Sequence, residues 1–246
     1  MATGQARALH EADPTRKVLM VGKDGQPRLH PIWDGNPRLL SLREFRKGVP
    51  HQVLANHSGR RPYIDYARST PERWAWNAWR ALRGEIYLDD AERRRFQDVR
   101  GRVVIEPHVK GPKQGNKQWG WPNWQALVHA RRDLQFVQLG PPGTVLLEGV
   151  AHVVTHTVRD AAAALSQVRM AVLPEGGLHH AAAALHVPAV VIFGGFINPQ
   201  NTGYDGHVNL FTGGAACGAK LPCPHCREAM ARIAAAEVAE VLDSLC

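Results

Sequence analysis

The stretch MAVLPEGGLHHAAAALHVPAVVIFGG, residues 170–195, decides the fold class of this chain. Residues 170–174 are apolar and end at Glu175, two glycines follow, and a run of small residues then has the composition of a short helix. Residues 189–193 form a second apolar, β-branched run, which is typical of a buried strand. A strand, a glycine turn, a helix and another strand make one β-α-β unit, so this stretch predicts a parallel sheet covered by helices.

The same alternation of strand and helix continues on both sides of this stretch. We expect strands over 103–106, 134–138 and 150–154, and helices over 122–131, 158–167, 178–186 and 234–245. The last of these helices places Val238, Val241, Leu242 and Leu245 on one apolar stripe. Parallel sheets of this kind bind ligands beyond the carboxyl ends of their strands, which is where Glu175 stands.

Residues 1–100 lack this alternation and follow other patterns. Residues 17–33 hold two apolar runs around an Asp-Gly pair, which predicts a β-hairpin. Residues 71–82 carry three tryptophans in a segment compatible with a helix, and such closely spaced indoles are expected to fill a core or an interface rather than to stack on bases. Residues 89–100 predict a polar surface helix with two aspartates at its start. We therefore divide the chain into residues 1–100 and 101–246.

The composition is that of a folded protein. Of the 246 residues, 44% are hydrophobic and 21% are charged, far from the composition of chains that remain disordered. The longest apolar run, residues 188–197, is shorter than the roughly 20 residues of a membrane-spanning helix. The first residues lack the basic-then-apolar order of a secretory signal, and four cysteines do not make a disulfide framework. We therefore expect a cytoplasmic protein without a membrane span.

The positive charge is concentrated in the N-terminal part. The net charge is +8; residues 1–100 hold 19 Lys and Arg against 12 Asp and Glu, whereas residues 101–246 hold 11 against 10. A positive region favours phosphate-bearing partners such as nucleic acid, acidic glycans or anionic lipid head groups. A solvated surface that keeps the protein in solution accounts for the same charges.

The glycine turn after Glu175 has the chemistry of an anion site. Glycine has no Cβ, so a ligand can approach the backbone there, and the N–H groups at the start of a helix favour a phosphate or a pyrophosphate. A tight turn beside a surface glutamate and a core histidine is the alternative interpretation. The motifs of serine hydrolases, zinc proteases and P-loop nucleotidases do not occur in the sequence, so these classes lose support.

Residues 103–246 resemble a known family. Glu175-Gly176-Gly177-Leu178-His179-His180, followed by Pro188 and Phe193-Gly194, is similar to the sugar-nucleotide-binding signature of the family 9 glycosyltransferases, which are heptosyltransferase-like proteins of the GT-B type. Asn116-Lys117-Gln118-Trp119 resembles the family's Lys-x-Trp-Pro segment, and residues 157–161 resemble the segment ahead of the signature. The resemblance implies an α/β, GT-B-like fold. Residues 101–246 would be a Rossmann-like domain that binds the donor, and residues 1–100 a reduced α/β region on the acceptor side.

The resemblance assigns roles by position. Glu175 stands where the family usually carries Asp, at the donor sugar and phosphates, and His180 matches the family histidine. Lys117 matches the lysine that neutralises charge on the leaving diphosphate, a task that suits a cation on a flexible stem. The implied donor contacts are Asn116, Gly176, Gly177, Leu178, His179, Thr202 and Gly203. A surface lysine, a core histidine and a polar loop over residues 198–204 are the corresponding structural interpretations.

The implied activity is the transfer, with inversion, of a heptose-like sugar from a nucleotide-diphosphate donor, commonly ADP-heptose. The acceptor would be a glycan or another phosphate-bearing molecule with a reactive hydroxyl, and neither a metal nor a cofactor is implied. The family's catalytic base follows its opening strand, and this sequence starts after that element, so we assign no base; Glu11, Asp13 and Asp34 suit surface or turn positions. Two alternatives remain: a non-catalytic sugar-nucleotide-binding protein, and a nucleic-acid-binding module that uses the basic N-terminal region.

Three cysteines lie close together near the C-terminal end. Cys217, Cys223 and Cys226, with His225, form the pattern C-x5-C-P-H-C. Three thiols and an imidazole can complete a tetrahedral zinc shell, but ligation by the adjacent His225 and Cys226 together would be strained. We therefore favour a local structural role for these cysteines, reduced or bridged, with zinc binding as the alternative.

Overall fold

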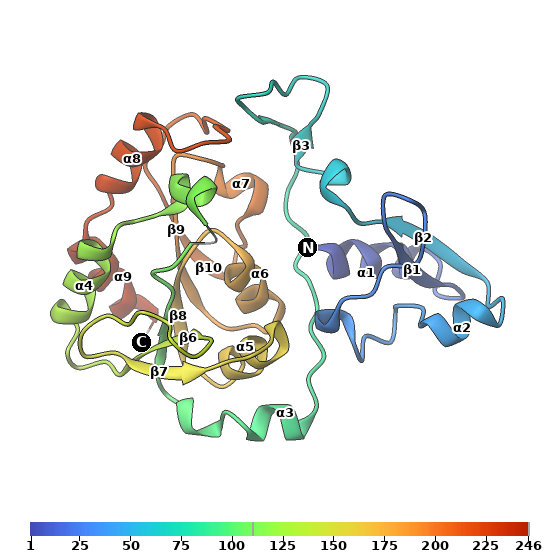
Figure 1. Cartoon of the computed structure of the whole chain (residues 1–246), viewed down its shortest axis with the longest axis horizontal. Helices are drawn as coiled ribbons and strands as arrows, with labels where there is room; N and C mark the ends of the chain where they lie inside the picture. The colour runs from blue at the N-terminus through green and yellow to red at the C-terminus, as the bar shows by residue number, and fades with distance from the viewer. Residues whose placement is uncertain (110, 246) are drawn as a thin grey trace.

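The computed structural model describes residues 1–109 and 111–245, and its largest element is a parallel sheet of six strands in the order β10-β9-β8-β5-β6-β7 (Figure 1). The strands are β5 Val103–Ile105, β6 Phe136–Gly140, β7 Ala151–Val154, β8 Met170–Pro174, β9 Ala189–Gly194 and β10 His207–Phe211. Counted along the chain this is the order 3-2-1-4-5-6 of a Rossmann-like sheet, which reverses between β5 and β8. The predicted α/β class is confirmed.

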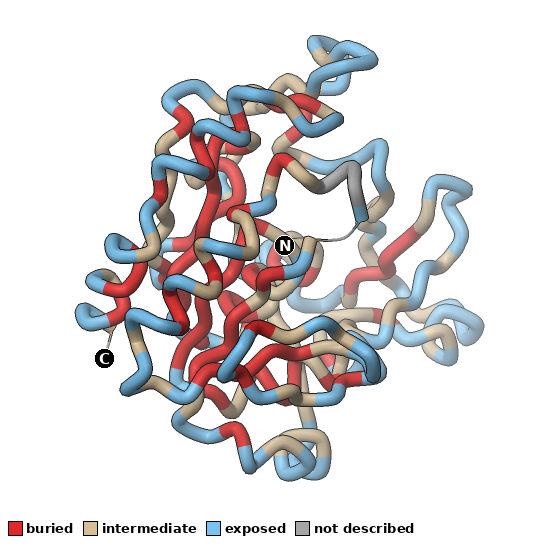
Figure 2. The backbone as a smooth tube through the Cα atoms, turned by 60° about the vertical axis from the view of Figure 1, so that its left-hand side comes forward, coloured by how far each residue is buried: buried red, intermediate tan, exposed pale blue. Residues whose placement is uncertain are grey.

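Helices cover both faces of this sheet. They are α4 Trp121–Ala130, α5 Val158–Leu165, α6 Gly177–Ala184, α7 Pro199–Thr202, α8 Pro224–Ala231 and α9 Ala235–Leu245. Met170 and Val172 of β8 point into one core with α4, α8 and α9, whereas Ala171 and Leu173 point into a second core with α5 and α6. This alternation follows from the two-residue period of a strand. Figure 2 shows the buried strands between the two partly exposed layers.

The final helix packs as its stripe predicts. Val238 and Leu242 of α9 are fully buried, and Val241 and Leu245 pack against the same core. α9 and α4 lie side by side in this layer. None of the described helices is long and apolar enough to cross a membrane.

The N-terminal part forms a smaller unit to the right of the sheet in Figure 1. Its elements are α1 Ala2–Ala12, β1 Lys17–Val21, η1 Pro31–Trp33, α2 Leu42–Arg46, β2 His51–Ala55, η2 Ser58–Arg60, β3 Ile64–Asp65 and β4 Ala75–Trp76. The short helices α3 Asp90–Arg94 and η3 Gln97–Val99 lead into β5, and η4 Pro112–Lys117 follows it. β1 and β2 pair in parallel, and Ala6 of α1 packs on Val18 and Met20. An extended strap, residues 77–89, returns to the large sheet past the start of α1. The division at residue 100 stays a prediction.

The predicted hairpin over residues 17–33 is wrong. β1 pairs with β2, residues 51–55, and only one antiparallel bridge joins Val21 to Pro27. The turn itself forms, because the N–H of Gly22 donates to the carbonyl oxygen of Gln26. The N–H of Arg28 still donates to the carbonyl oxygen of Met20, but beyond this point residues 38–40 occupy the same edge of β1, where Val18 bridges to Leu39.

The helix considered for residues 71–82 does not form either. Arg73 bridges to Ala219, the N–H of Trp74 donates to the carbonyl oxygen of Gly218, and β4 pairs with β3. These contacts hold the segment extended. The ring of Trp76 packs on Phe196, as expected of an indole in an interface. In the third segment, over 89–100, the helix is confirmed but shortened to α3 and η3, with a capping box at its start.

Candidate active site at the strand-order reversal

The two strands that flank the reversal of strand order each end at a glutamate. β5 is followed by Glu106 and β8 by Glu175, and the two strands pair in register, with Ile105 opposite Val172. The N–H of Glu106 donates to the carbonyl oxygen of Val172, which extends the ladder by one residue. The crevice at such a reversal is where open parallel sheets bind ligands. The two carboxyl groups therefore lie where the fold places a site.

Glu175 is a buried and ionised carboxylate. Its side chain is 6% exposed, its Oε2 atom forms an ion pair with Nζ of Lys117, and its Oε1 atom lies 3.9 Å from Nε2 of His180. Burial acts to raise the pKa of Glu175, but the charge of Lys117 holds that pKa below its ordinary value. The structure thus brings together the three residues predicted to be catalytic: Lys117, Glu175 and His180.

Lys117 reaches Glu175 from the end of η4. Its side chain is 19% exposed, and its Nζ atom also lies 5.2 Å from the centre of the Phe196 ring, within cation–π range. The ammonium group of Lys117 neutralises the carboxylate of Glu175 and lies where a metal ion bound to that carboxylate would lie. Glu175, His179 and His180 offer ligand atoms within 4.8 Å of one another, yet Lys117 already occupies this carboxylate. The charge pattern favours a site for an anion next to Lys117.

The turn after Glu175 is open toward solvent. Gly177 is exposed, and a Cβ built on it would meet no atom within 4 Å; one built on Gly176 would meet only the carbonyl oxygen of Pro174, at 3.8 Å. Neither glycine has a φ in the left-handed range, since the φ of Gly176, 175°, is that of extended backbone, so neither packing nor backbone strain requires glycine here. The first N–H groups of α6 lack partners within the helix and begin at this turn. The arrangement leaves room for a ligand against the backbone.

The two histidines after the turn are neutral. His179 is fully buried against Phe193, Tyr204 and His207, and burial lowers its pKa to about 3. Its Nδ1 atom accepts a hydrogen bond from the N–H of Gly176 at 3.4 Å, so His179 fixes the turn from its buried side. Burial also holds the pKa of His180 well below its ordinary value, and Nδ1 of His180 lies 3.0 Å from the hydroxyl of Tyr204. His180 is therefore an uncharged hydrogen-bonding group.

Solved structures share this architecture. No protein-family model and no curated protein matches the sequence. The structure of a glycosyl transferase family 9 protein from Veillonella parvula superposes with a TM-score of 0.68 at 14% identity, over 99% of this chain and 92% of that one. The fold of this chain is that of the family 9 glycosyltransferases. The resemblance seen in residues 103–246 is confirmed at the level of the fold.

Two further structures agree. The iron-containing dodecameric glycosyltransferase TibC from enterotoxigenic E. coli has a TM-score of 0.61 at 16% identity, over 99% of this chain and 74% of that one. The E. coli ADP-heptose lps heptosyltransferase II has a TM-score of 0.50 at 17% identity, over 82% of this chain and 67% of that one. The chain covers 45% of the E. coli heptosyltransferase WaaC.

In this family 9 fold, three of the predicted donor contacts face other parts of the protein. The Nδ2 atom of Asn116 donates to the carbonyl oxygens of Ala219 and Leu221, at 2.8 and 2.7 Å, so its amide faces a loop rather than the turn. Thr202 is buried beside Glu175. A Cβ on Gly203 would lie 2.6 Å from the carbonyl oxygen of Pro199, so packing alone explains that glycine. Their contacts with a donor stay predictions.

Glu106 is a candidate site residue that the sequence analysis did not single out. Burial raises its pKa to about 7, against the opposing effect of a hydrogen bond donated by the N–H of His108. Glu106 lines a cavity of about 430 Å³ that reaches Leu178. A raised pKa in a cleft is typical of functional carboxyl groups. The available signal was the same as at Glu175, a glutamate directly after a short buried strand.

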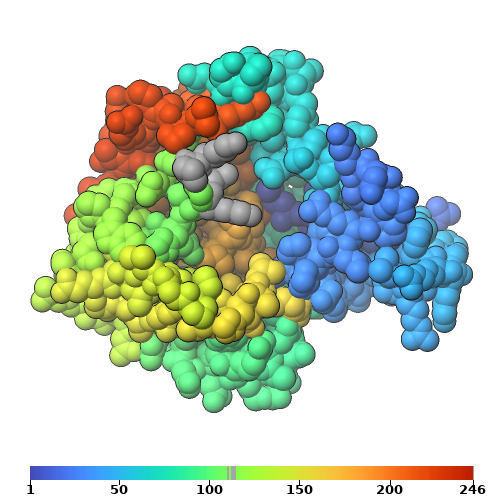
Figure 3. All heavy atoms as spheres, viewed as in Figure 1, coloured from blue at the N-terminus to red at the C-terminus, as the bar shows by residue number. Residues whose placement is uncertain are grey.

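The N-terminal unit faces the turn across a mostly apolar cleft. The cleft has a volume of about 340 Å³ and is lined by Gly177 and His180 on one side and by Ile32 and Trp33 on the other. Figure 3 shows the hollow between the N-terminal unit and the sheet. The glycine turn after Glu175 is thus one wall of a cleft whose other wall comes from residues 1–100.

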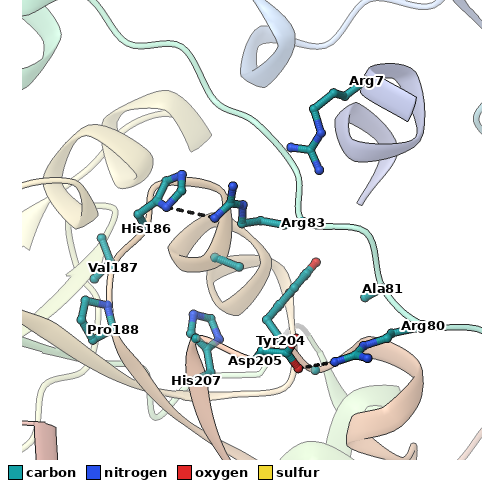
Figure 4. A pocket seen from close by; sticks show the side chains of 13 residues that line it. Arg7, Arg80, Ala81, Arg83, His186, Val187, Pro188, Tyr204, Asp205 and His207 are labelled. Atoms are coloured by element: carbon teal, nitrogen blue, oxygen red, sulfur yellow. Dashed lines mark hydrogen bonds and ion pairs between the residues drawn. The ribbon is translucent and has the colours of Figure 1, made fainter. Parts of the chain in front are cut away.

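Part of the N-terminal positive charge gathers elsewhere, in a second cavity of about 420 Å³ (Figure 4). Arg80 pairs there with Asp205, and Arg83 is hydrogen-bonded to the ring of His186 at 3.0 Å. Pro188, which precedes β9, also lines this cavity, so it opens at the amino ends of the strands. Arg80 and Arg83 therefore lie at the end of the sheet opposite to Glu175, away from the glycine turn.

Proposed function

We propose that this chain is an inverting glycosyltransferase that binds a nucleotide-diphosphate sugar at the β8–α6 turn. The observation that carries the proposal is the buried ion pair of Lys117 and Glu175 beside an open glycine turn, at the strand-order reversal of a family 9 fold. An ion pair in this position supplies a movable cation where a diphosphate would leave.

The diphosphate would lie on the first N–H groups of α6. Amides at the start of a helix and the positive end of its dipole stabilise phosphate oxygens. Gly177 and Leu178 supply these amides, and the missing side chain of Gly177 leaves space for the ligand. Gly176, held by His179 from behind, sets the direction of the turn.

Lys117 would neutralise the charge that develops on the leaving diphosphate. Its flexible stem lets the ammonium group move from Glu175 to a phosphate oxygen, where it stabilises the transition state more than the ground state. Glu175, freed of its partner, would accept hydrogen bonds from hydroxyls of the donor sugar. Neutral His180 would donate or accept one hydrogen bond without adding charge.

Glu106 would face the phosphates from the neighbouring strand. A carboxyl group with a pKa of about 7 is partly protonated at neutral pH and can donate a hydrogen bond to a phosphate oxygen. An ionised carboxylate in the same place would repel the diphosphate. We therefore include Glu106 among the proposed donor-binding groups.

The donor we propose is ADP-heptose or a similar sugar nucleotide, because the fold matches the E. coli ADP-heptose lps heptosyltransferase II. The acceptor, a glycan or another phosphate-bearing molecule, would enter the cleft that faces Trp33. We expect a cytoplasmic reaction that needs no added divalent cation and no cofactor.

Calorimetric titration tests the donor site. ADP-heptose is expected to bind, and UDP- and GDP-sugars serve to define the nucleotide. Lys117→Ala should weaken binding about tenfold or more, the size expected for loss of a charge-assisted contact. Lys23→Ala, at an exposed turn, is the matched control and should change nothing. Silence from all three donors in a folded sample would refute the proposal.

A transfer assay separates an enzyme from a binding protein. Labelled donor with a glycan acceptor mixture should give a product of inverted anomeric configuration. Binding without product or donor hydrolysis would favour the non-catalytic alternative. The nucleic-acid alternative has less support, because the ring of Trp76 packs against Phe196 and one face of the Trp74 ring is covered by the ammonium group of Lys220.

A further inference from the structure

Two thiols and an imidazole converge where α8 begins, and a third thiol, that of Cys223, lies beside Cys217. Sγ of Cys217 lies 3.2 Å from Sγ of Cys226 and 3.8 Å from Sγ of Cys223. Ligand atoms of Cys217, His225 and Cys226 all lie within 4.8 Å of one another. The structure thus brings the adjacent residues 225 and 226 to one place with Cys217, and the strain of joint ligation by His225 and Cys226 stays an expectation. Neighbours on a helix point about 100° apart, which lets both face the loop that carries Cys217.

The backbone brings these groups together from two segments. Cys223 is the N-cap of α8, and Cys226 lies in its first turn, where the positive end of the helix favours thiolates. The N–H of Cys217 donates to the carbonyl oxygen of Gly195 at 2.9 Å, which anchors the opposite side of the cluster. The result is a knuckle, residues 217–226, that holds its sulfur atoms on one side.

The distances are those of ligands around one ion. With metal–sulfur bonds of about 2.3 Å, a tetrahedral site separates its sulfur atoms by about 3.8 Å. The two separations at Cys217, 3.2 and 3.8 Å, lie close to this value.

His225 has the hydrogen bond that a metal-bound histidine usually makes. Its Nε2 atom lies 3.0 Å from the carbonyl oxygen of Gly213. A proton on Nε2 that is donated to this carbonyl leaves Nδ1 as the lone-pair nitrogen. Ligating histidines commonly donate their other ring N–H to a backbone carbonyl in this way.

We propose that Cys217, Cys223 and Cys226, with Nδ1 of His225, bind one tetrahedral transition-metal ion, zinc or iron, and that the loaded knuckle positions Lys117. Sulfur-rich tetrahedral sites select these two metals. The ion is structural, because no ligand position remains open for a substrate. The metal site stands independently of the proposed function.

The link to Lys117 runs through Asn116. Besides its two donated bonds to the loop, Oδ1 of Asn116 accepts a hydrogen bond from the N–H of Cys223 at 2.9 Å. A Cβ on Gly115 would lie 2.9 Å from Pro222, so the knuckle and η4 are in close contact. Asn116 is thus a positioning residue, since it ties the metal-binding knuckle to the residue next to Lys117.

Metal analysis of the purified protein tests the site. The chain is expressed with zinc and iron salts, purified with a thiol reductant, and measured by plasma mass spectrometry. One ion per chain is expected, with visible absorption if it is iron and none if it is zinc. Cys217→Ser and Cys226→Ser should each lose most of the metal, whereas the control Glu175→Gln should retain it. Loss of metal in Glu175→Gln alone would place the ion at the turn and overturn the proposal.

A measurement on the unmodified chain covers variants that fail to fold. A mercurial that blocks thiols should release one ion to a colorimetric chelator, and cobalt reconstitution should give sulfur-to-cobalt charge-transfer bands. Release of less than about 0.1 ion per chain, or an intact mass lower by two hydrogens, would show free or bridged cysteines and overturn the site.

Lysine acetylation followed by mass spectrometry tests the positioning of Lys117. Removal of the metal should raise the labelling of Lys117 several-fold while the labelling of Lys23 stays constant. Equal labelling of Lys117 with and without metal would refute the coupling, even where metal is bound. This readout does not depend on any donor or acceptor.

Discussion

Glu106→Gln should make the protein more stable in neutral and alkaline solution and leave it unchanged in acid. Burial raises the pKa of Glu106 in the folded protein from its ordinary value of 4.5 to about 7. Between these two pH values the folded state holds a proton that the unfolded state has released. The free energy of unfolding therefore falls as pH rises through this window, and the stabilisation present below pH 4.5 is lost by about pH 7.

The size of the effect follows from the same two pKa values. A rise from 4.5 to about 7 corresponds to about 3 kcal/mol at 1.36 kcal/mol for each tenfold change in proton affinity. Glutamine keeps the shape and can still accept the hydrogen bond from the N–H of His108, but it never ionises. The variant should gain up to about 3 kcal/mol over the natural chain at pH 8 and almost nothing at pH 4.

Urea denaturation of both proteins from pH 4 to pH 8.5 measures this difference. The histidines titrate in the same range, but they are common to both chains and cancel in the subtraction. A difference in unfolding free energy that does not change with pH would show that Glu106 has an ordinary pKa and would refute the argument. In the proposed enzyme, the same variant should retain donor binding at pH 8, because a neutral amide does not repel a diphosphate.

Three further predictions concern the turn and the contact with the N-terminal unit. Lys117→Ala leaves the buried carboxylate of Glu175 unpaired and should lower the free energy of unfolding, measured by urea denaturation, by about 3–5 kcal/mol. The double variant Lys117→Met with Glu175→Leu should recover most of that stability without recovering turnover, and recovery of both would make the pair structural. Burial lowers the pKa of His179 to about 3, so below pH 6.5 the unfolded state binds a proton that the folded state does not, and the free energy of unfolding should fall as pH drops. His179→Gln should reduce this loss of stability in acid, and an unchanged loss would contradict the burial effect. Arg159 pairs with Glu92 and donates to carbonyl oxygens of the N-terminal unit, so Arg159→Ala should speed proteolysis of the strap over residues 77–89, and equal cleavage rates would show that other contacts hold the unit.

The large sheet could be predicted from the sequence because its signals are local. Residues 170–174 coincide with β8, and the stripe of α9 packs as its spacing indicates. Each unit has a buried strand, a turn and a helix, and the right-handed crossover of such units leaves few alternatives for the order of the strands. The family signature then placed the site at the turn, where the structure brings Lys117 to Glu175.

The remainder depends on contacts between distant residues. The strand pairing of residues 17–21 with 51–55, rather than with the nearer run, joins segments that are distant along the chain, and residues 38–40 take the other edge of the same strand. Glu106 joins the candidate site only because β5 and β8 become neighbours in the sheet, and no local sequence pattern predicts that pairing. The same holds for Asn116, whose side chain is fixed by a loop about a hundred residues later.

Three features of the turn are not explained by folding alone. A buried ion pair such as that of Lys117 and Glu175 contributes little net stability, because the loss of hydration offsets most of the attraction. Gly177 lies where any side chain would fit within the protein, and glycine at that point costs conformational entropy. Glu106 carries a raised pKa that lowers stability at neutral pH. All three would be unfavourable or neutral in a turn that only connects a strand to a helix, and each becomes favourable once an anion rests against the backbone between them.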